Sequence, residues 1–210
     1  MTAVSVEDEP VVAAQLFGSR IDLARAYTRE LGQRGEELGL IGPLEPPRLW
    51  SRHILNCVLV APLLRAGTVG DIGSGAGLPG LVLAIARPDV HFVLIEPMER
   101  RIDWLEREST ELGLDNVTVL RARAEDVRLD SGLDQVTARA VTSLSKLIPI
   151  TAPLLRPGGE MVFLKGARVS DEVTAAARQI RRARLTGVEV LELGADILPE
   201  VTRVFRATVD

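Results

Sequence analysis

The chain has 210 residues, of which 46% are hydrophobic and 26% charged, and its formal net charge is -4 at pH 7. This composition fits one globular domain with a sizeable core, and no apolar run reaches the roughly 18 residues of a membrane span. The single cysteine, Cys57, excludes an internal disulfide and a cysteine-rich metal cluster. Because the acidic start MTAVSVEDEP lacks the pattern of a signal peptide, we expect a cytoplasmic protein with no membrane anchor and no metal.

The first 66 residues are predicted to be mainly helical. Apolar residues between Pro10 and Leu40 recur with a period near 3.6, which predicts an amphipathic helix. A loop rich in glycine and proline follows at residues 39–49. Ser51 is then predicted to cap a buried helix over residues 51–64. Residues 1–66 should therefore form a helical segment in front of a main domain at 67–210, the two together making one compact unit.

From residue 67 onward, strands and helices are predicted to alternate. Strands are expected at 68–72, 91–96, 116–122, 133–140, 158–165, 187–193 and 202–209. Helices are expected at 79–86, 97–112, 143–155 and 170–184, and two prolines should kink or break the third of these. Alternation of this kind predicts βαβ units and a mostly parallel sheet. The last two strands should pair as an antiparallel hairpin, which makes the fold α/β and Rossmann-like.

A glycine-rich run, VGDIGSGAGLPG, follows the first predicted strand and fits two nucleotide-binding motifs. Residues 75–80 match G-x-G-x-x-G, the dinucleotide fingerprint. Residues 71–77 match D-x-G-x-G-x-G, which resembles the first motif of class I S-adenosylmethionine-dependent methyltransferases. The strand ends most naturally at Ile72, so the turn starts at Gly73 rather than at the first glycine of the dinucleotide pattern. This register favours the methyltransferase motif.

The charge beside the loop favours the same choice. Asp71 would repel a pyrophosphate, whereas a carboxylate suits the cationic amino group of S-adenosylmethionine. Glycines such as Gly73, Gly75 and Gly77 would let the amino-acid tail of that ligand lie against the backbone. We therefore expect these four residues to belong to a cofactor site.

Further candidates follow the later strands, because ligands of open α/β sheets bind beyond the carboxyl ends of the strands. Glu96 ends the second strand, where an acid can accept both ribose hydroxyls of either nucleotide cofactor. Glu125 or Asp126, after the third strand, can contact an adenine amino group. Arg139 and Lys165 end the fourth and fifth strands. A guanidinium at that position can meet the cofactor, a phosphate or a flipped base, although a salt bridge to a nearby acid is an equal alternative.

The chain lacks the marks of several methyl-transfer chemistries. Carbon-5 methylation of a pyrimidine needs a cysteine nucleophile, but Cys57 lies in an apolar segment and is expected to be core. The sequence after the fourth strand, ARAVTSLSK, contains no Asn/Asp-Pro-Pro-aromatic turn of the kind used for exocyclic amines. A ring nitrogen with a free lone pair, such as guanine N7, needs no deprotonation, so proximity and alignment can supply most of the rate.

Six segments occur in an order that is specific to one family. They are RHILN (52–56), DIGSGAGLPG (71–80), IEPMERR (95–101), RAED (123–126), ARAV (138–141) and FLKG (163–166). Together they resemble the RsmG (GidB) family of bacterial 16S rRNA guanine-N7 methyltransferases. The resemblance implies a class I fold of seven strands and S-adenosylmethionine as the methyl donor. It also implies a target in the region of guanine 527, near the decoding centre, with 16S rRNA or the small ribosomal subunit as the partner.

The resemblance also assigns residues. It places Gly73, Leu78, Ala124, Glu125 and Arg139 at positions that contact the cofactor. With Arg139, we expect Lys165 and His53 to position the reacting groups, and we expect no general base.

The chain departs from the family pattern before the glycine loop. Asn56-Cys57 stands where the family usually has Asp-Ser, and residues 34–50 lack its Trp-Asn and Asn-Leu-Thr elements. Three alternatives therefore stay open: a nicotinamide-dependent oxidoreductase, a methyltransferase acting on a small molecule or a protein, and a binding module without turnover. The first is disfavoured because the only tyrosine, Tyr27, has no lysine four residues later. The second is favoured by the negative net charge.

Overall fold

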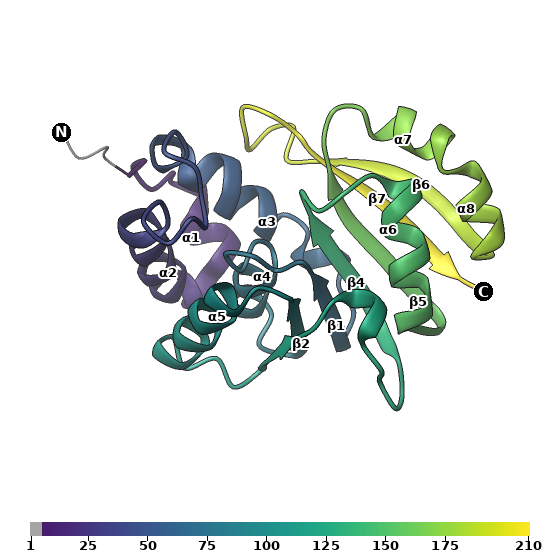
Figure 1. Ribbon diagram of the computed structural model, residues 1–210. Helices are drawn as coiled ribbons and strands as arrows, with labels where there is room; N and C mark the ends of the chain where they lie inside the picture. The colour runs from purple at the N-terminus through teal and green to yellow at the C-terminus, as the bar shows by residue number, and fades with distance from the viewer. Residues whose placement is uncertain (1–5) are drawn as a thin grey trace.

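The computed structural model describes residues 6–210 and contains one seven-stranded sheet with helices on both faces (Figure 1). The strands lie in the order β3-β2-β1-β4-β5-β7-β6. Their bounds are β1 Gly67–Ile72, β2 Val90–Glu96, β3 Val117–Arg121, β4 Leu133–Arg139, β5 Leu155–Lys165, β6 Leu185–Leu193 and β7 Thr202–Val209. Strands β1 to β5 pair in parallel, whereas β7 is antiparallel to both β5 and β6. The predicted parallel sheet with a terminal antiparallel hairpin is therefore confirmed.

The helices cover the two faces of the sheet and build two hydrophobic clusters. Their bounds are α1 Val12–Phe17, α2 Ile21–Arg34, α3 Asn56–Val58, α4 Gly80–Ala86, α5 Glu99–Glu111, α6 Leu144–Thr151, α7 Val169–Ala175 and α8 Ala177–Arg182. Buried residues of α1 to α5 share one cluster, and buried residues of α6 and α7 belong to the other. The sheet is thus covered on both sides, which is why β1, β2 and β5 consist largely of apolar residues.

Residues 6–66 pack on the sheet domain and share its core. Tyr27 of α2 and Leu55 are fully buried in the same cluster as Leu83 of α4 and Trp104 of α5. None of the helices within residues 6–210 combines the length and the apolar character that a membrane span requires.

Two details of the helical segment differ from the prediction. The helix expected from Pro10 to Leu40 is interrupted at Gly18, which has a left-handed φ of 53° and ends α1. Ser51 does not cap a helix but lies inside a π-helix, Trp50–Leu55. Its backbone N–H and its hydroxyl both donate to the Glu7 carboxylate, so the serine anchors the irregular N-terminal segment around Glu7.

Two later helices are shorter than expected. The predicted helix 143–155 ends at Thr151, and a 3₁₀ turn, Ala152–Leu154, with Pro153 near its start leads into β5. The predicted helix 170–184 is divided at Ala176, a fully buried residue with φ -90° and ψ 6°. The predicted stop after α5 is present, since Gly113 has a left-handed φ of 62°.

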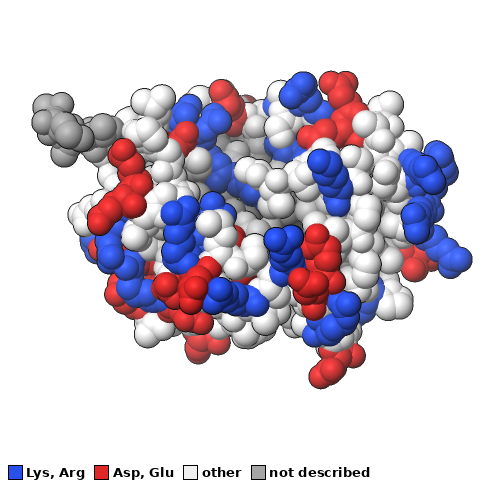
Figure 2. All heavy atoms as spheres, viewed as in Figure 1, with Lys and Arg blue, Asp and Glu red and all other residues white. Residues whose placement is uncertain are grey.

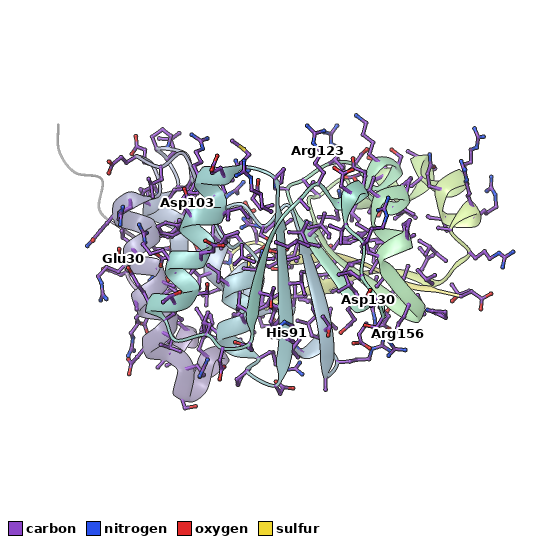
Figure 3. The ribbon with its side chains drawn as sticks, turned by 60° about the horizontal axis from the view of Figure 1, so that its bottom comes forward. Glu30, His91, Asp103, Arg123, Asp130 and Arg156 are labelled. Carbon is purple, nitrogen blue, oxygen red and sulfur yellow. The ribbon has the colours of Figure 1, made fainter. Side chains whose placement is uncertain are left out.

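The carboxyl ends of β1, β2, β4 and β5 lie together along one side of the sheet, the edge that runs across the strand ends. Arg123, which follows β3, lies at this edge in Figure 3, while His91 and Arg156 lie at the opposite edge. The chain crosses from the β1–β2–β3 half to the β4–β5 half here, and such a switch point is where open α/β sheets bind ligands.

Candidate active site

A cavity of about 410 Å³ lies beyond the carboxyl ends of β1, β2 and β4, next to the glycine-rich turn. We call it the glycine-loop cavity. Its lining includes many of the predicted residues: Gly73, Glu96, Ala124, Glu125 and Arg139, together with Met98, Arg101, Val141 and Ile150. Met98 and Val141 are large apolar side chains that are each 41% exposed. The cavity therefore combines apolar walls with two carboxylates, those of Glu96 and Glu125, an arrangement that suits a nucleoside.

Gly73 begins the turn after β1, as the register argument predicts. Its φ is 68°, a conformation that glycine adopts without strain, and its N–H donates to the Ile95 carbonyl at 2.8 Å. A Cβ at this position would lie 3.0 Å from Cγ2 of Val141 across the cavity. The absence of a side chain at Gly73 thus keeps the cavity open.

The rest of the turn is fixed from three directions. The Ala76 carbonyl accepts hydrogen bonds from the Tyr27 hydroxyl and from Trp104 Nε1, each at 2.8 Å. The Gly75 N–H donates to Oε2 of Glu96 at 3.0 Å. Because Tyr27 and Trp104 are buried, these bonds are shielded from water and hold the turn in one conformation.

Glu96 lies at the base of the glycine-loop cavity and is 1% exposed. Besides the bond from Gly75, its Oε1 accepts from the Met98 N–H at 3.1 Å, and Arg101 Nη1 lies 3.5 Å from Oε2. A carboxylate offers about four acceptor positions, so Glu96 retains capacity for a further donor such as a ribose hydroxyl. These contacts orient the carboxylate before any ligand binds.

Asp71 lies beneath the turn and is fully buried, outside the cavity lining. Its Oδ2 accepts from the Gly80 N–H at 3.0 Å, while its Oδ1 has no hydrogen-bond partner among the described residues. Burial is the largest influence on this carboxyl group and raises its pKa to about 7. The side chain supports the start of α4 and does not reach the cavity.

Three other predicted cofactor residues also shape the turn without lining the cavity. Gly75 supplies the N–H that Glu96 accepts, and Gly77 has φ 96° with Leu81 packed where its Cβ would stand. Leu78 is half-buried and packs against the core cluster.

A second cavity, of about 430 Å³, lies beyond the ends of β4, β5 and β7. We call it the basic cavity, because five basic side chains and one acidic side chain line it: Arg48, Arg52, Arg139, Lys165, Arg203 and Glu200. The space-filling view shows the molecule hollowed between its N-terminal helices and its C-terminal half, with basic side chains at this hollow (Figure 2). Arg139 and Ala140 line both cavities and form the wall between them.

Arg139 is held at this wall by the π-helix. Its Nη2 lies 2.7 Å from Nδ1 of His53 and 3.2 Å from the Arg52 carbonyl, and Nη1 lies 3.9 Å from Sγ of Cys57. On the other side of the imidazole, Nε2 of His53 lies 2.6 Å from Oε2 of Glu45. Among the residues that the structure describes, no carboxylate forms the salt bridge to Arg139 that was the alternative, and its charge faces both cavities.

The protonation of this group follows from its surroundings. Burial first, and then the charge of Arg139, lower the pKa of His53 to about 4. His53 is therefore neutral at pH 7, with its proton on the nitrogen that faces Glu45. Cys57 is fully buried and burial raises its pKa to about 11, so the thiol is part of the core, as expected.

Lys165 ends β5 on the floor of the basic cavity. Its ammonium lies 2.7 Å from Oε2 of Glu172 and donates to the Thr142 carbonyl at 2.9 Å. Across the antiparallel pair, Lys165 stands opposite Arg203, the second residue of β7. Two cations thus face each other at the end of the sheet. Within residues 6–210, no cluster of three or more His, Cys, Asp or Glu side chains offers a metal site.

Sequence reasoning missed several residues that the structure brings to the site. The sequence predicts only a loop around Glu45 and only a strand around Arg203, with no role for either side chain. The sequence also does not predict that the Tyr27 hydroxyl and Trp104 Nε1 bond to the glycine-rich turn. The position of Glu45, a charged residue in a Pro-rich loop directly before the segment that carries His53, is a signal that could have indicated its role. Nothing in the local sequence indicates the contacts of Arg203, Tyr27 and Trp104.

Comparison with known proteins identifies the family. The family described as rRNA small subunit methyltransferase G (GidB) matches residues 20–197. The chain is 68% identical over 205 residues to "Ribosomal RNA small subunit methyltransferase G" of Clavibacter sepedonicus, covering 98% of this chain and 97% of that protein. The chain belongs to this family. A Corynebacterium glutamicum protein of the same name is 48% identical and covers 92% of this chain and 88% of its own length.

Solved structures agree with this placement in the GidB family at the level of the fold. A methyltransferase from Aquifex aeolicus that depends on S-adenosylmethionine has a TM-score of 0.59 at 18% identity, covering 83% of this chain and 98% of that one. An O-methyltransferase from Thermotoga maritima has a TM-score of 0.57 at 17% identity, covering 74% and 64%. The class I methyltransferase fold is thereby confirmed. Because the chain belongs to a methyltransferase family with this fold, S-adenosylmethionine is its cofactor.

Proposed function

We propose that this chain transfers a methyl group from S-adenosylmethionine to N7 of a guanine in 16S rRNA, in the region of guanine 527 near the decoding centre. Membership of the GidB family supports the reaction class. The proposal includes the small ribosomal subunit as partner and the cytoplasm as location, since the ribosomal RNA of a bacterium is there.

The observation that carries the proposal is the contact between the two cavities. The glycine-loop cavity has the apolar walls and the oriented Glu96 carboxylate that a ribonucleoside needs. The basic cavity has five cationic side chains, which suit a polyanion. Because Arg139 and Ala140 belong to both linings, a donor in one cavity and an acceptor in the other would meet at this wall.

We assign the cofactor contacts as follows. The ribose hydroxyls would donate to Glu96, and the adenine would lie between the apolar side chains near Ala124 and Glu125. The amino-acid tail would lie along Gly73 toward Arg139, whose guanidinium matches a carboxylate. Asp71, Gly75, Gly77 and Leu78 would act by fixing the turn.

The acceptor chemistry explains why the site needs no general base. When bound, S-adenosylmethionine supplies an electrophilic methyl group on a sulfonium, and the lone pair of guanine N7 can displace the thioether directly. The nitrogen carries no proton that must be removed. His53 already uses both imidazole nitrogens in contacts with Arg139 and Glu45, so its role, like that of Lys165, is to position charge. Holding donor and acceptor in line then supplies most of the rate.

The net charge of -4 does not oppose an RNA substrate. Cations concentrated in one cavity create a local positive potential whatever the total charge of the chain. This distribution favours RNA over the small-molecule and protein substrates considered from the sequence.

The proposal is tested with purified protein and two substrates. Calorimetry should show binding of S-adenosylmethionine and none of NAD. With radiolabelled donor, small subunits or 16S rRNA from a strain lacking the gene should take up label as N7-methylguanosine after nuclease digestion. Label in another nucleoside, or none in either RNA preparation, would refute the proposed acceptor.

A further inference from the structure

The basic cavity contains one acidic side chain that nothing in the cofactor site explains. Glu200 lines this cavity together with five basic side chains, and it is exposed. All five basic side chains have other partners: four pair with acids, which are Arg48 and Arg52 with Glu45, Lys165 with Glu172 and Arg203 with Glu192, and the fifth, Arg139, contacts His53. Among residues 6–210, Glu200 itself has no ion-pair or hydrogen-bond partner for its side chain.

The loop that carries Glu200 is anchored on both sides. Leu198 is 8% exposed within the core cluster, and its N–H donates to the Gly194 carbonyl at 2.9 Å. Thr202 is 1% exposed, and its hydroxyl accepts from Nδ2 of Asn56 at 2.7 Å. With fixed residues two positions before and after it, Glu200 is held at the edge of the cavity.

The sheet sets the distance between Glu200 and the wall shared with the glycine-loop cavity. Arg139 ends β4, while Glu200 stands just before β7, two strands further along the order β4-β5-β7. Adjacent strands lie about 4.8 Å apart, so the ends of β4 and β7 are about 10 Å apart across the sheet. Val204 is the β7 residue level with Arg139 through Leu164, and Glu200 lies four residues beyond it, in the loop that overhangs the cavity. Arg139 and Glu200 line this one cavity, so a purine base seated in it can lie between a methyl donor at the wall and the carboxylate of Glu200.

We propose that Glu200 selects the target base, by accepting hydrogen bonds from N1–H and the N2 amino group of a guanine seated in the basic cavity. The inference rests on the proposed function, because it takes guanine N7 as the acceptor. N7 lies on the imidazole side of the purine, and N1 and N2 lie on the Watson–Crick edge, so one base can address both ends of the cavity.

The chemistry of a carboxylate discriminates among the bases. Its two oxygens accept the two parallel N–H donors that only guanine presents side by side. Adenine would turn the lone pair of its N1 toward the carboxylate, which is repulsive, and has only C2–H beside it. Enzymes that act on flipped bases read them by hydrogen bonds to this same edge, and the repulsion adds discrimination against adenine. The cations around Glu200 would hold the neighbouring phosphates.

The test combines a change in the protein with a change in the RNA. 16S rRNA is ligated from two pieces so that the mapped target position carries guanosine or inosine, which lacks the N2 amino group, and is reconstituted into small subunits. The kcat/KM of methylation is measured for both substrates with the wild-type protein and with Glu200→Ala. Any effect of inosine on the reactivity of N7 or on RNA structure is common to both proteins and cancels in the comparison.

The expected result is that the change in the protein and the change in the RNA remove the same interaction, so that their effects on kcat/KM do not add. Wild type should prefer guanosine over inosine by about 10-fold or more, and Glu200→Ala should lower kcat/KM on guanosine by about 10- to 100-fold. In Glu200→Ala the preference for guanosine should fall to within about 3-fold. Asp196→Ala removes an exposed acid of the same loop that does not line the cavity, and it should keep the wild-type preference.

Two results would overturn the inference, and they are distinguishable. If Glu200→Ala kept the full preference for guanosine over inosine, Glu200 would not read the base, although the methyltransferase function would stand. If wild type left the guanosine substrate unmethylated, the proposed function would fail as well. Calorimetry of S-adenosylmethionine with both variants checks the fold, because a folded Glu200→Ala protein should bind the cofactor with unchanged affinity.

Discussion

Nη2 of Arg139 lies 2.7 Å from Nδ1 of His53, and this contact determines which imidazole nitrogen carries the proton. A guanidinium can only donate, so Nδ1 accepts and Nε2 holds the proton that it donates to Glu45 at 2.6 Å. His53 and, through it, Glu45 thus hold Arg139 at the wall between the glycine-loop cavity and the basic cavity.

Removal of the acceptor at position 53 should reduce methylation. His53→Ala leaves Arg139 without its hydrogen bond to the imidazole, and we expect kcat/KM to fall by about 10- to 100-fold, the value of a hydrogen bond to a charged group. His53→Asn places an amide oxygen near the position of Nδ1 and should recover most of the activity. His91→Ala, at the opposite edge of the sheet (Figure 3), is the control and should be neutral. Equal losses in His53→Ala and His53→Asn would contradict the positioning role.

Glu96→Ala should weaken cofactor binding. The variant loses the acceptor for the ribose and also the two bonds that orient the Gly75 and Met98 N–H groups. We expect the free energy of binding to fall by about 1–3 kcal/mol, or about 5- to 150-fold in Kd by calorimetry. Glu99→Ala removes a nearby exposed acid that pairs with Arg121 and should leave Kd unchanged. A normal Kd for Glu96→Ala would remove Glu96 from the site.

Gly73→Ala and Gly113→Ala form a matched pair, because both glycines have φ near 65°. Each alanine should cost about 1–2 kcal/mol of unfolding free energy in urea melts, owing to the left-handed backbone. A Cβ at Gly113 meets nothing within 4 Å, whereas one at Gly73 reaches Val141 across the glycine-loop cavity. Only Gly73→Ala should therefore lose affinity for S-adenosylmethionine. Parallel behaviour of the two variants in calorimetry would show that the cofactor does not lie against Gly73.

Asp71→Asn should change how stability depends on pH. Burial raises the pKa of Asp71 to about 7, above the 3.8 of an exposed aspartate. Between these values the folded protein retains a proton that the unfolded chain has released, so this group lowers stability as pH rises. Relative to Asp71→Asn, the wild-type unfolding free energy should decline by up to ~4 kcal/mol between pH 4 and pH 8. Urea melts across this range check it, and a constant difference would contradict the assigned pKa.

Much of the sheet was predictable because its strands are buried on both sides. Mainly apolar runs such as HFVLIE and MVFLK are typical of strands that are buried on both faces of a parallel sheet. The glycine-rich turn indicates where β1 ends. The helical segment was less predictable. A period of 3.6 continues through Gly18 in the sequence, but the backbone turns there, and Ser51 found a partner in Glu7 that lies 44 residues away.

The same contrast holds for the site. Gly73, Glu96 and Arg139 were predictable because each sits at the carboxyl end of a strand or directly after it, where the fold itself places a ligand. Glu45 was not, since its effect on Arg139 passes through His53 and depends on how a loop packs against a π-helix. The donors Tyr27 and Trp104 reach Ala76 from 49 and 28 residues away, and no local pattern encodes such contacts.

The most direct test of the account is a map of N7-methylguanosine in 16S rRNA from cells with and without this gene. N7 methylation makes the nucleotide sensitive to borohydride and aniline, so primer extension shows a stop at the modified position. We predict a stop near guanine 527 in wild type that is lost on deletion, returns with the intact gene, and stays absent with Glu96→Ala at equal protein level. An unchanged stop in the deletion strain would contradict the central claim.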